Sequence, residues 1–382
     1  MASTDFKTQS KFVPGKNPGV KGYWPVALDI GYSGVKGFSP NSVFCFPSFV
    51  RQEEGEMIGK HDPMDMQYRD ETGVYDVGES AIETLSLSET QSGGLSILGR
   101  NRYTNRMFLI LARVGMALGM TQNEFGDPGI RTVFLQTGLP PAYMVSDEPL
   151  LKSALAGRHL FSLRMGDGDW KTYDVLLPPE NIQVMPQPMG AMFGAATDDS
   201  CVQLPEGGDY LRSGLLVFDG GFGTLDTFDV VSGRIVDSQT FPQYGMAAVF
   251  KRLSKEIMKR YHTEISLTGL QKVLASGTIT SFDRGTMTTR DYTITPLLEE
   301  CSREICQEAL REIKSLYNDL RERRYLLITG GTGAAWYPYL SEHFAGLSTL
   351  RVIRDEWVKE LGSIFSNVRG YYLFLVTALR SR

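Results

Sequence analysis

The sequence predicts an α/β fold made of two related domains with mixed sheets. The chain has 382 residues, and at ~150 residues per domain this length suits two or three domains. Short apolar strands alternate with helical stretches and hairpins, which is typical of mixed sheets covered by helices. In addition, one strand-and-turn motif occurs twice, about half the chain apart, which indicates a duplicated domain.

Composition narrows the classes of function. Apolar residues make up 42% and charged residues 22%, as in ordinary globular proteins. The 39 Lys and Arg against 44 Asp and Glu give a net charge of −5. Direct nucleic-acid binding is therefore disfavoured, because contact with phosphates draws on a basic excess. The four cysteines and four histidines show no CxxC pair and no zinc spacing, so we expect a reduced, cytoplasmic chain.

No targeting or membrane segment is apparent. The N-terminal residues lack the apolar stretch of a secretory signal, and the most apolar helical stretch, Met107–Met120, is shorter than the ~18 residues that a bilayer span requires. We therefore expect no membrane partner.

The first half of the chain begins with a polar arm, 1–24, which reads as flexible. The first strand is expected at Pro25–Ile30. The region from about 39 to 100 is acidic with poor periodicity, and we expect a small inserted subdomain there. Apolar spacing and Gly or Pro breakers then predict a helix over Asn101–Met120, a strand over Thr132–Gln136, a helix near Asp147–Ala156, a hairpin over His159–Leu177 and a strand over Asn181–Met185.

The second half opens with a helix of small residues after the breaker Pro186-Gln187-Pro188. A second inserted segment is expected at about 264–300. The other predicted elements are a strand over Leu215–Asp219, two further strands, a helix over Gly245–His262, an amphipathic helix over Leu297–Arg321, a strand over Arg324–Thr329, a strand near Thr349–Ile353 and C-terminal helices.

The repeated motif covers Val26–Phe38 and Leu216–Phe228. Each copy reads as an apolar strand, an Asp, one residue, a Gly, an aromatic residue, a short polar stretch and a second strand that contains a Phe. The two aspartates are Asp29 and Asp219. One such motif alone is most often just a hairpin turn, but two matched copies are harder to explain that way.

The chemistry of these turns points to a polyphosphate. Glycine lets the turn backbone approach an anion, and successive N–H groups there can bind it. Asp29 and Asp219 at the strand ends can hold a hydrated Mg²⁺, which needs only one or two carboxylates. Lys36 can meet a β- or γ-phosphate, whereas the second copy has Asp226 instead. The candidate phosphate-binding residues are Gly31, Tyr32, Ser33, Gly34, Lys36, Gly220, Gly221, Phe222, Gly223 and Thr224.

A third glycine turn, Gly330-Gly331-Thr332-Gly333, follows the strand near Tyr325–Thr329 and opens a helix. Taken alone it is a strand–helix turn. Beside the two hairpins it is expected to pack against the adenine and ribose of a nucleotide. The GxGxxG and GxxxxGK[ST] phosphate loops are both absent.

These three elements, in this order, resemble the actin-like ATPase superfamily. Val184–Ala191 is similar to its first connecting segment, which carries a Gln or Glu beside the γ-phosphate, and Phe365–Tyr371 is similar to its second connecting helix. The strand end Thr137–Pro140 and the chain length resemble the bacterial plasmid-segregation branch, the ParM/StbA-like proteins.

The resemblance implies an actin-like fold, in which two related α/β domains surround a nucleotide cleft and each carries a small inserted subdomain. The first domain would cover 25–185 with its insertion at about 39–100. The second would cover 186–355 with its insertion at about 264–300. Residues 356–382 would form C-terminal helices that return to the first domain. The arm 1–24 precedes the usual start of such chains.

The resemblance also implies an activity. The chain would bind ATP or GTP with Mg²⁺, polymerise into filaments, hydrolyse the nucleotide and move plasmid DNA through a ParR-like DNA-binding adaptor. Asp29 and Asp219 would orient Mg²⁺ and its waters, Lys36 would neutralise charge on the β–γ bridge, and Gln187 would position the attacking water. Lys251 is a candidate contact to the base or ribose; a solvated helix face is its alternative interpretation.

Two other classes share this fold. A small-molecule kinase, of the sugar or acetate type, needs a carboxylate that faces the acceptor hydroxyl, and no motif for one is visible. A chaperone-type nucleotide switch needs a large peptide-binding domain, for which we expect no room after Arg382. The filament-forming ATPase is the favoured interpretation, and the kinase is its alternative.

Overall fold

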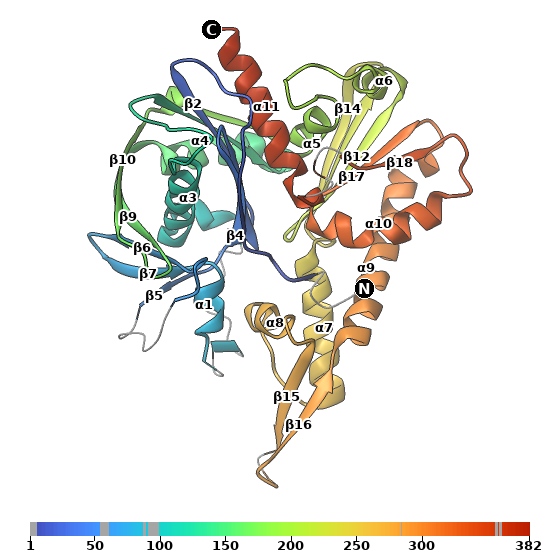
Figure 1. Ribbon diagram of the computed structural model, residues 1–382. Coiled ribbons are helices and arrows are strands. Elements are labelled where there is room, and N and C mark those ends of the chain that lie inside the picture. Colours follow the sequence, from blue (N-terminus) through green and yellow to red (C-terminus); the bar gives the residue numbers. More distant parts are fainter. Residues whose placement is uncertain are drawn as a thin grey trace.

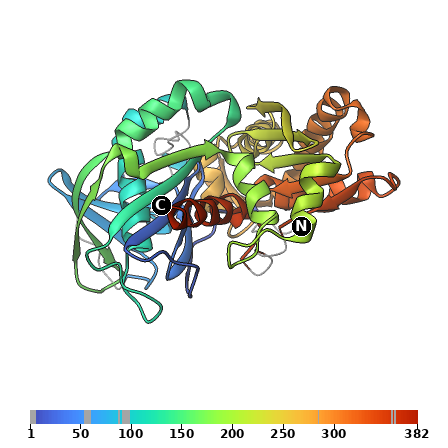
Figure 2. The ribbon, with the colours of Figure 1, turned by 90° about the horizontal axis from the view of Figure 1, so that it is seen from above.

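The computed structural model describes residues 6–53, 61–86, 89–90, 99–283, 285–355, 358 and 361–382. Two α/β domains lie side by side, and helix α11 (Ser366–Arg380) runs between them (Figures 1 and 2). Each domain is built on a mixed sheet. The predicted class, two related α/β domains with mixed sheets, is thereby confirmed.

The main sheet of the first domain has six strands in the order β1-β4-β3-β2-β8-β11. β2, β8 and β11 are parallel, and the other pairs are antiparallel. Alternate residues of β2 face α3 (Arg106–Gly119) and α11, which is why this strand is apolar along its whole length. The strands are β1 (Lys11–Pro14), β2 (Tyr23–Ile30), β3 (Gly34–Ser39), β4 (Ser42–Pro47), β8 (Thr132–Leu139) and β11 (Ile182–Pro186).

The main sheet of the second domain repeats this arrangement. Its order is β14-β13-β12-β17-β18, with β12, β17 and β18 parallel and the hairpin strands antiparallel. β12 therefore corresponds to β2 and β13 to β3, so the two sequence repeats occupy equivalent places. The strands are β12 (Leu215–Gly220), β13 (Leu225–Val231), β14 (Arg234–Phe241), β17 (Tyr325–Thr329) and β18 (Arg351–Ile353).

A second sheet completes the first domain, in the order β10-β9-β6-β7-β5. The expectation that residues 39–100 form a separate insertion is wrong in its bounds, because β4 belongs to the main sheet and 157–177 supply two strands here. Short strands need such partners, since a lone hairpin is marginally stable in water. The strands are β5 (Val50–Gln52), β6 (Met66–Asp70), β7 (Gly73–Val77), β9 (Gly157–Met165) and β10 (Lys171–Leu177).

The outer part of the second domain consists of α7 and α9 with the hairpin β15 (Thr278–Asp283) and β16 (Thr288–Thr293), which projects away from the main sheet (Figure 1). Among the described residues, no helix is both long and apolar enough to cross a bilayer. The other helices are α1 (Glu79–Glu83), α4 (Met144–Leu155), α5 (Gln187–Ala195), α6 (Pro205–Ser213), α7 (Met246–Tyr261), α8 (Leu267–Val273), α9 (Thr295–Leu316) and α10 (Gly331–Phe344), with short 3₁₀ turns at Arg100–Thr104, Pro141–Tyr143, Pro179–Asn181, Asn318–Leu320 and Ser363–Phe365.

Helices α5 and α11 cross in direct backbone contact. A Cβ atom on Gly370 would overlap the carbonyl oxygen of Gly190, and one on Gly190 would overlap the ring of Tyr371. Only glycine fits at these two positions because the helix axes approach so closely. The first residues of α5 follow β11 of the first domain, and the far end of α5 packs on β12 of the second. The crossing therefore joins the two domains.

The N-terminal residues belong to the fold. The expectation of a flexible arm over 1–24 is wrong for residues 6–24, and 1–5 lie outside the described residues. Lys11–Pro14 pair with the free edge of β4, and the Phe12 ring stacks on Phe44 at 6.4 Å between centroids. Phe6 is only 5% exposed and lies in the core of the second domain. An open sheet edge accepts a short extra strand, even one of mixed composition.

Candidate functional site

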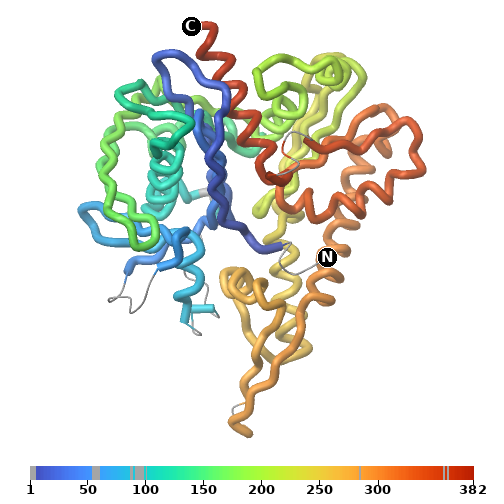
Figure 3. Tube along the Cα trace, in the orientation of Figure 1, coloured from blue at the N-terminus to red at the C-terminus, as the bar shows by residue number. Residues whose placement is uncertain are grey.

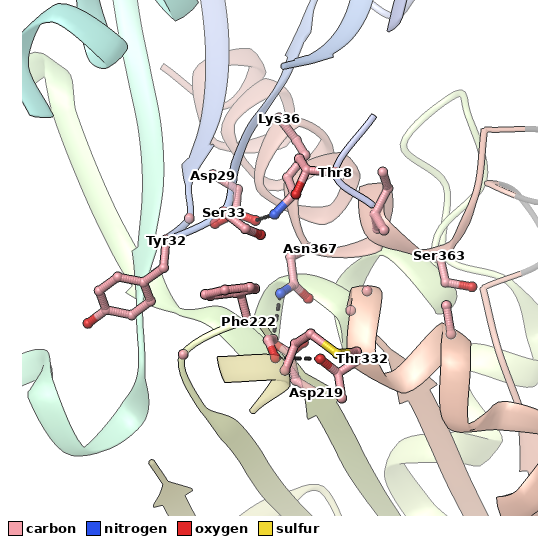
Figure 4. A pocket seen from close by; sticks show the side chains of 18 of the residues that line it. Thr8, Asp29, Tyr32, Ser33, Lys36, Asp219, Phe222, Thr332, Ser363 and Asn367 are labelled. Atoms are coloured by element: carbon pink, nitrogen blue, oxygen red, sulfur yellow. Dashed lines mark hydrogen bonds and ion pairs between the residues drawn. The ribbon is translucent and has the colours of Figure 1, made fainter. Parts of the chain in front are cut away.

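A cavity of about 450 Å³ lies between the two domains, lined by both glycine hairpins, the start of α5, the start of α10 and residues 361–364 (Figure 4). Most of the predicted site residues meet here, whereas Gly34, Gly220, Gly333 and Lys251 do not line the cavity. Those that do are Asp29, Gly31, Tyr32, Ser33, Lys36, Gln187, Asp219, Gly221, Phe222, Gly223, Thr224, Gly330, Gly331 and Thr332.

The two hairpin turns have the same backbone geometry. The Gly31 N–H donates to the Gly34 carbonyl at 3.1 Å, and the Gly221 N–H donates to the Thr224 carbonyl at 2.9 Å. A side chain on Gly31 would come within 2.9 Å of that same Gly34 oxygen. The equivalence that the sequence repeat predicts therefore extends to individual hydrogen bonds.

The two turns contact each other through Tyr32. Its ring occupies the space that a side chain on Gly223 would need, so the large Tyr32 requires a glycine at position 223. The Arg102 guanidinium stacks over this ring at 4.5 Å from its centroid and donates to the Ile30 carbonyl at 2.9 Å. Tyr32, a bulky residue for a phosphate turn, thus packs the first hairpin against the second.

Asp29 is held by Lys36 of the first domain and by Gln187 at the start of α5. Its Oδ2 accepts from Lys36 Nζ at 3.1 Å, because the two residues are paired across the β2–β3 hairpin. Its Oδ1 accepts from Gln187 Nε2 at 3.3 Å. Gln187 is the first residue of α5 and lies between Pro186 at the N-cap and Pro188 in the first turn, whose fixed φ angles restrict the backbone on both sides of it. Lysine, carboxylate and amide therefore meet at one point of the cavity.

Asp219 faces the same cavity from the second domain. Its Oδ2 accepts from Asn367 Nδ2 at 2.7 Å. Burial raises the pKa of Asp219 to about 6, the Asn367 hydrogen bond lowers it, and the nearby Asp29 raises it further. Asn367 was missed as a site residue. The available signal was its place in the first turn of a helix, in a segment already matched to the second connecting helix.

Asp226 is a further buried carboxyl at the site. It pairs with Asp219 across the β12–β13 hairpin and is 1% exposed. Its Oδ2 accepts from Thr224 Oγ1 at 2.9 Å, whereas its Oδ1 has no hydrogen-bond partner. Burial raises the pKa of Asp226 to about 8, and the charge of Asp219 adds to this effect. Without a cation, burial and the neighbouring Asp219 therefore favour the neutral form of this carboxyl.

These carboxyl groups fit a hydrated divalent cation. Asp29 and Asp219 reach the cavity from opposite domains, and the unpartnered oxygen of Asp226 lies beside them. In the described part of the chain, no three His, Cys, Asp or Glu side chains form a cluster that could hold a metal ion directly. Mg²⁺ keeps several of its waters and takes one or two carboxylates, so this arrangement accommodates it.

Replacing the buried carboxyl is expected to stabilise the nucleotide-free protein. The pKa of Asp226 is raised to about 8, so ionisation costs the folded state free energy increasingly from pH ~4 up to pH ~8, in total a few kcal/mol. Asp226→Asn should therefore melt at a higher temperature than the parent chain at pH 8 in EDTA, and at nearly the same temperature at pH 4.5. Thermal melts at both pH values check this; a difference that grows toward low pH would contradict it.

The third glycine turn packs edge-on against the second hairpin. Gly330 has φ +78°, and a side chain there would overlap the Gly220 carbonyl. A Cβ on Gly220 would lie 2.5 Å from the backbone nitrogen of Gly333. Thr332 Oγ1 donates to the Gly221 carbonyl at 2.6 Å. Gly220 and Gly333 thus serve the close approach of β12 and α10, while Gly330, Gly331 and Thr332 line the cavity.

Lys251 is exposed on α7 and does not reach the cavity. The start of α7 instead braces the second turn, since Met246 N–H donates to the Gly221 carbonyl at 3.2 Å and Ala247 N–H to the Phe222 carbonyl at 2.8 Å. The neighbouring Arg252 pairs with Glu304 and Glu308 of α9. The placement of Lys251 matches its alternative interpretation, a solvated helix face.

Comparisons with known proteins agree with this geometry. Residues 27–190 match the family described as actin like proteins N terminal domain. Solved structures match nearly the whole chain. One is a 15-stranded ParM filament from Clostridium botulinum, with a TM-score of 0.70 at 18% identity over 93% of this chain and 99% of that one. The fold is actin-like.

Two more solved structures with this actin-like fold are instructive. The pCBH ParM non-polymerisable quadruple mutant has a TM-score of 0.69 at 19% identity, over 92% of this chain and 98% of its own. The archaeal actin homolog Ta0583, solved as a complex with ADP, has a TM-score of 0.62 at 16% identity over 94% and 100%. No curated protein sequence matches the chain. At these identities the structures establish the fold.

Proposed function

We propose that this chain is a filament-forming nucleoside triphosphatase of the plasmid-segregation kind. It binds ATP or GTP with Mg²⁺ in the cavity between its domains, hydrolyses it and assembles with copies of itself. The observation that carries the proposal is the pair of equivalent glycine hairpins, which bring Asp29 and Asp219 to one cavity from opposite domains of an actin-like fold. A polyphosphate with its cation matches both the backbone N–H groups and the carboxylates.

Several cavity residues have defined roles in this proposal. The turn N–H groups and Lys36 bind the β- and γ-phosphates, and Asn367 holds Asp219 in its orientation. Gln187 lies at the start of α5 with its amide on Asp29, from where the amide can orient the attacking water. A neutral amide is a poor base, so its contribution is positioning, which is the main source of catalysis in phosphoryl transfer. Mg²⁺, held through its waters by Asp29 and Asp219, supplies charge neutralisation.

The same proposal includes self-assembly and a partner. Solved structures with this fold include filaments of ParM and of Alp12, which supports self-association. The net charge of −5 suits a filament that moves DNA through a ParR-like DNA-binding adaptor instead of touching the DNA. The cytoplasm is the compartment where such a plasmid system operates.

Nucleotide should switch assembly. Closure of two domains around a polyphosphate sets the subunit shape that a neighbour recognises in a head-to-tail contact. We expect the pure chain to sediment as filaments with Mg-ATP or Mg-GTP at about tens of micromolar protein, a range where weak assembly contacts are populated. A non-hydrolysable analogue should give more persistent filaments. Pelleting and negative-stain microscopy measure both.

The kinase alternative makes the opposite prediction. A small-molecule kinase stays in the supernatant with every nucleotide, and an acceptor substrate stimulates its hydrolysis. Sedimentation that no nucleotide changes, in a chain that nevertheless binds Mg-ATP, would contradict the filament proposal and favour the kinase.

A further inference from the structure

The N-terminal segment runs directly across the cavity. Phe6, Lys7, Thr8 and Gln9 all line it. In Figure 3 the blue N-terminal trace passes from the first domain toward the second. Its described part begins at Phe6, which is packed in the core of the second domain. The chain thus bridges the domains here, in addition to the connections at α5 and at residues 361–366. This bridge has no counterpart in the sequence repeat, because nothing equivalent precedes the second copy.

The segment is attached to both domains. On the second domain, Phe6 is 5% exposed within the core, and the Thr8 N–H donates to Gln271 Oε1 on α8 at 3.3 Å. On the first domain, Lys7 forms an ion pair with Glu79 of α1, and Ser10 Oγ donates to the same carboxylate at 3.3 Å. These contacts alternate between the two domains and hold the segment in place over the cavity.

Thr8 lies over the first phosphate hairpin. Its Cγ2 atom would be 2.8 Å from a Cβ on Gly34, so the segment rests on the turn backbone itself. Figure 4 shows Thr8 beside Lys36, the lysine assigned to the phosphates. A polyphosphate bound between the two hairpins would be enclosed on this side by residues 6–9.

We propose that residues 6–9 form a clasp that retains bound nucleotide, with Phe6 as its anchor in the second domain. The proposal rests on the function proposed above. Opening of the cleft separates the attachments of the segment, so Phe6 has to leave its site before nucleotide can escape. Nucleotide binding and attachment of the clasp both favour the closed state. Bound nucleotide therefore strengthens the attachment of the clasp, and an attached clasp raises the affinity for nucleotide by the same factor.

The clasp makes a kinetic prediction. Phe6→Ala should raise the dissociation rate of ADP carrying a fluorescent N-methylanthraniloyl group by ~10-fold or more, with a much smaller change in association rate, because interface changes act mainly on dissociation. Phe12→Ala is the matched control: it removes the same ring from the same segment, but Phe12 packs on Phe44 and does not line the cavity. Its dissociation rate should stay within about two-fold of the parent. Stopped-flow chase with unlabelled ADP measures both rates.

A second measurement uses the unaltered chain, which covers the case that Phe6→Ala fails to fold. Trypsin cleaves after Lys7, inside the clasp, and after Lys21, which is exposed and outside it. Saturating Mg-ADP should slow cleavage at Lys7 several-fold and leave cleavage at Lys21 unchanged.

The outcomes separate the clasp from the proposed function. Equal dissociation rates for Phe6→Ala and the parent, or equal cleavage at Lys7 with and without Mg-ADP, would overturn the clasp while nucleotide binding stands. Failure of the parent chain to bind any labelled nucleotide would overturn the proposed function itself.

Discussion

Asp219→Asn should lose Mg-ATP binding by ~100-fold or more while the fold stays intact. A carboxylate that meets a divalent cation and a triphosphate contributes a charge-assisted interaction that an amide cannot replace. The substitution keeps the shape of the side chain, and the Asn367 amide that now donates to Asp219 Oδ2 can donate to the new amide oxygen. Isothermal titration with Mg-ATP measures the affinity.

The stability of this variant distinguishes a binding defect from a folding defect. Burial raises the pKa of Asp219 to about 6, so at pH 7.5 the ionised carboxylate costs the folded state free energy, and the amide removes that cost. The nucleotide-free variant should therefore melt no lower than the parent. The parent should gain ~2.7 kcal/mol of stability with Mg-ATP at a hundred times its Kd, and the variant should gain almost none.

Lys251→Ala is the matched control for the site as a whole. Lys251 was predicted as a ligand but is exposed and lies outside the cavity, so its loss should leave Mg-ATP affinity within about two-fold, as for a surface substitution. Unchanged affinity in Asp219→Asn would remove the cavity from consideration as the nucleotide site, and a large loss in Lys251→Ala would place the base near α7 instead.

Gln187→Ala should separate binding from turnover. The Gln187 amide contacts Asp29 at 3.3 Å and is proposed to orient water, so its loss should slow hydrolysis in the assembled state by ~100-fold, the scale on which a lost positioning group acts. Mg-ATP affinity should change by less than about three-fold. Phosphate release after pelleting measures turnover, and titration of the monomer measures binding.

Gln183→Ala provides the comparison for this experiment. Gln183 lies on β11, four residues earlier, and does not line the cavity, so both quantities should match the parent. Filaments of Gln187→Ala should also persist longer than those of the parent, because the γ-phosphate remains. Hydrolysis within a few-fold of the parent would show that Gln187 has been given the wrong role.

The sequence repeat predicted the centre of the site because each turn is determined by a few neighbouring residues. A strand that ends in Asp-x-Gly forms the same turn in both domains, and the two turns meet because the domains share one topology. Gly220 and Gly333 were predicted as phosphate or nucleotide contacts, but they allow β12 and α10 to pack closely. In the sequence, a glycine required for packing looks the same as a glycine that binds phosphate.

What the sequence could not predict depends on contacts between distant segments. The hairpin 157–177 completes a sheet with β6 only after the chain has folded back. Phe6 is a single apolar residue and Lys11–Pro14 a short, mostly apolar run, both between polar stretches, without the periodicity that would mark them as core. Their places depend on an open edge of β4 and on the second domain. Asn367 reaches Asp219 across 148 positions of the chain, a distance at which single-sequence patterns carry no information.

The contact between Gly190 and Gly370 gives the molecule a mechanical property. Gly370 meets the backbone of Gly190 directly, and the Tyr371 ring fills the space beside Gly190, so the two helices have little room to shift at their crossing. The β15–β16 hairpin stands at the far end of the second domain (Figure 1). A small rotation of the second domain about this crossing therefore moves the hairpin further than residues near the crossing. If nucleotide binds in the cavity as proposed, loss of its γ-phosphate would displace the β15–β16 hairpin further than any residue near the crossing.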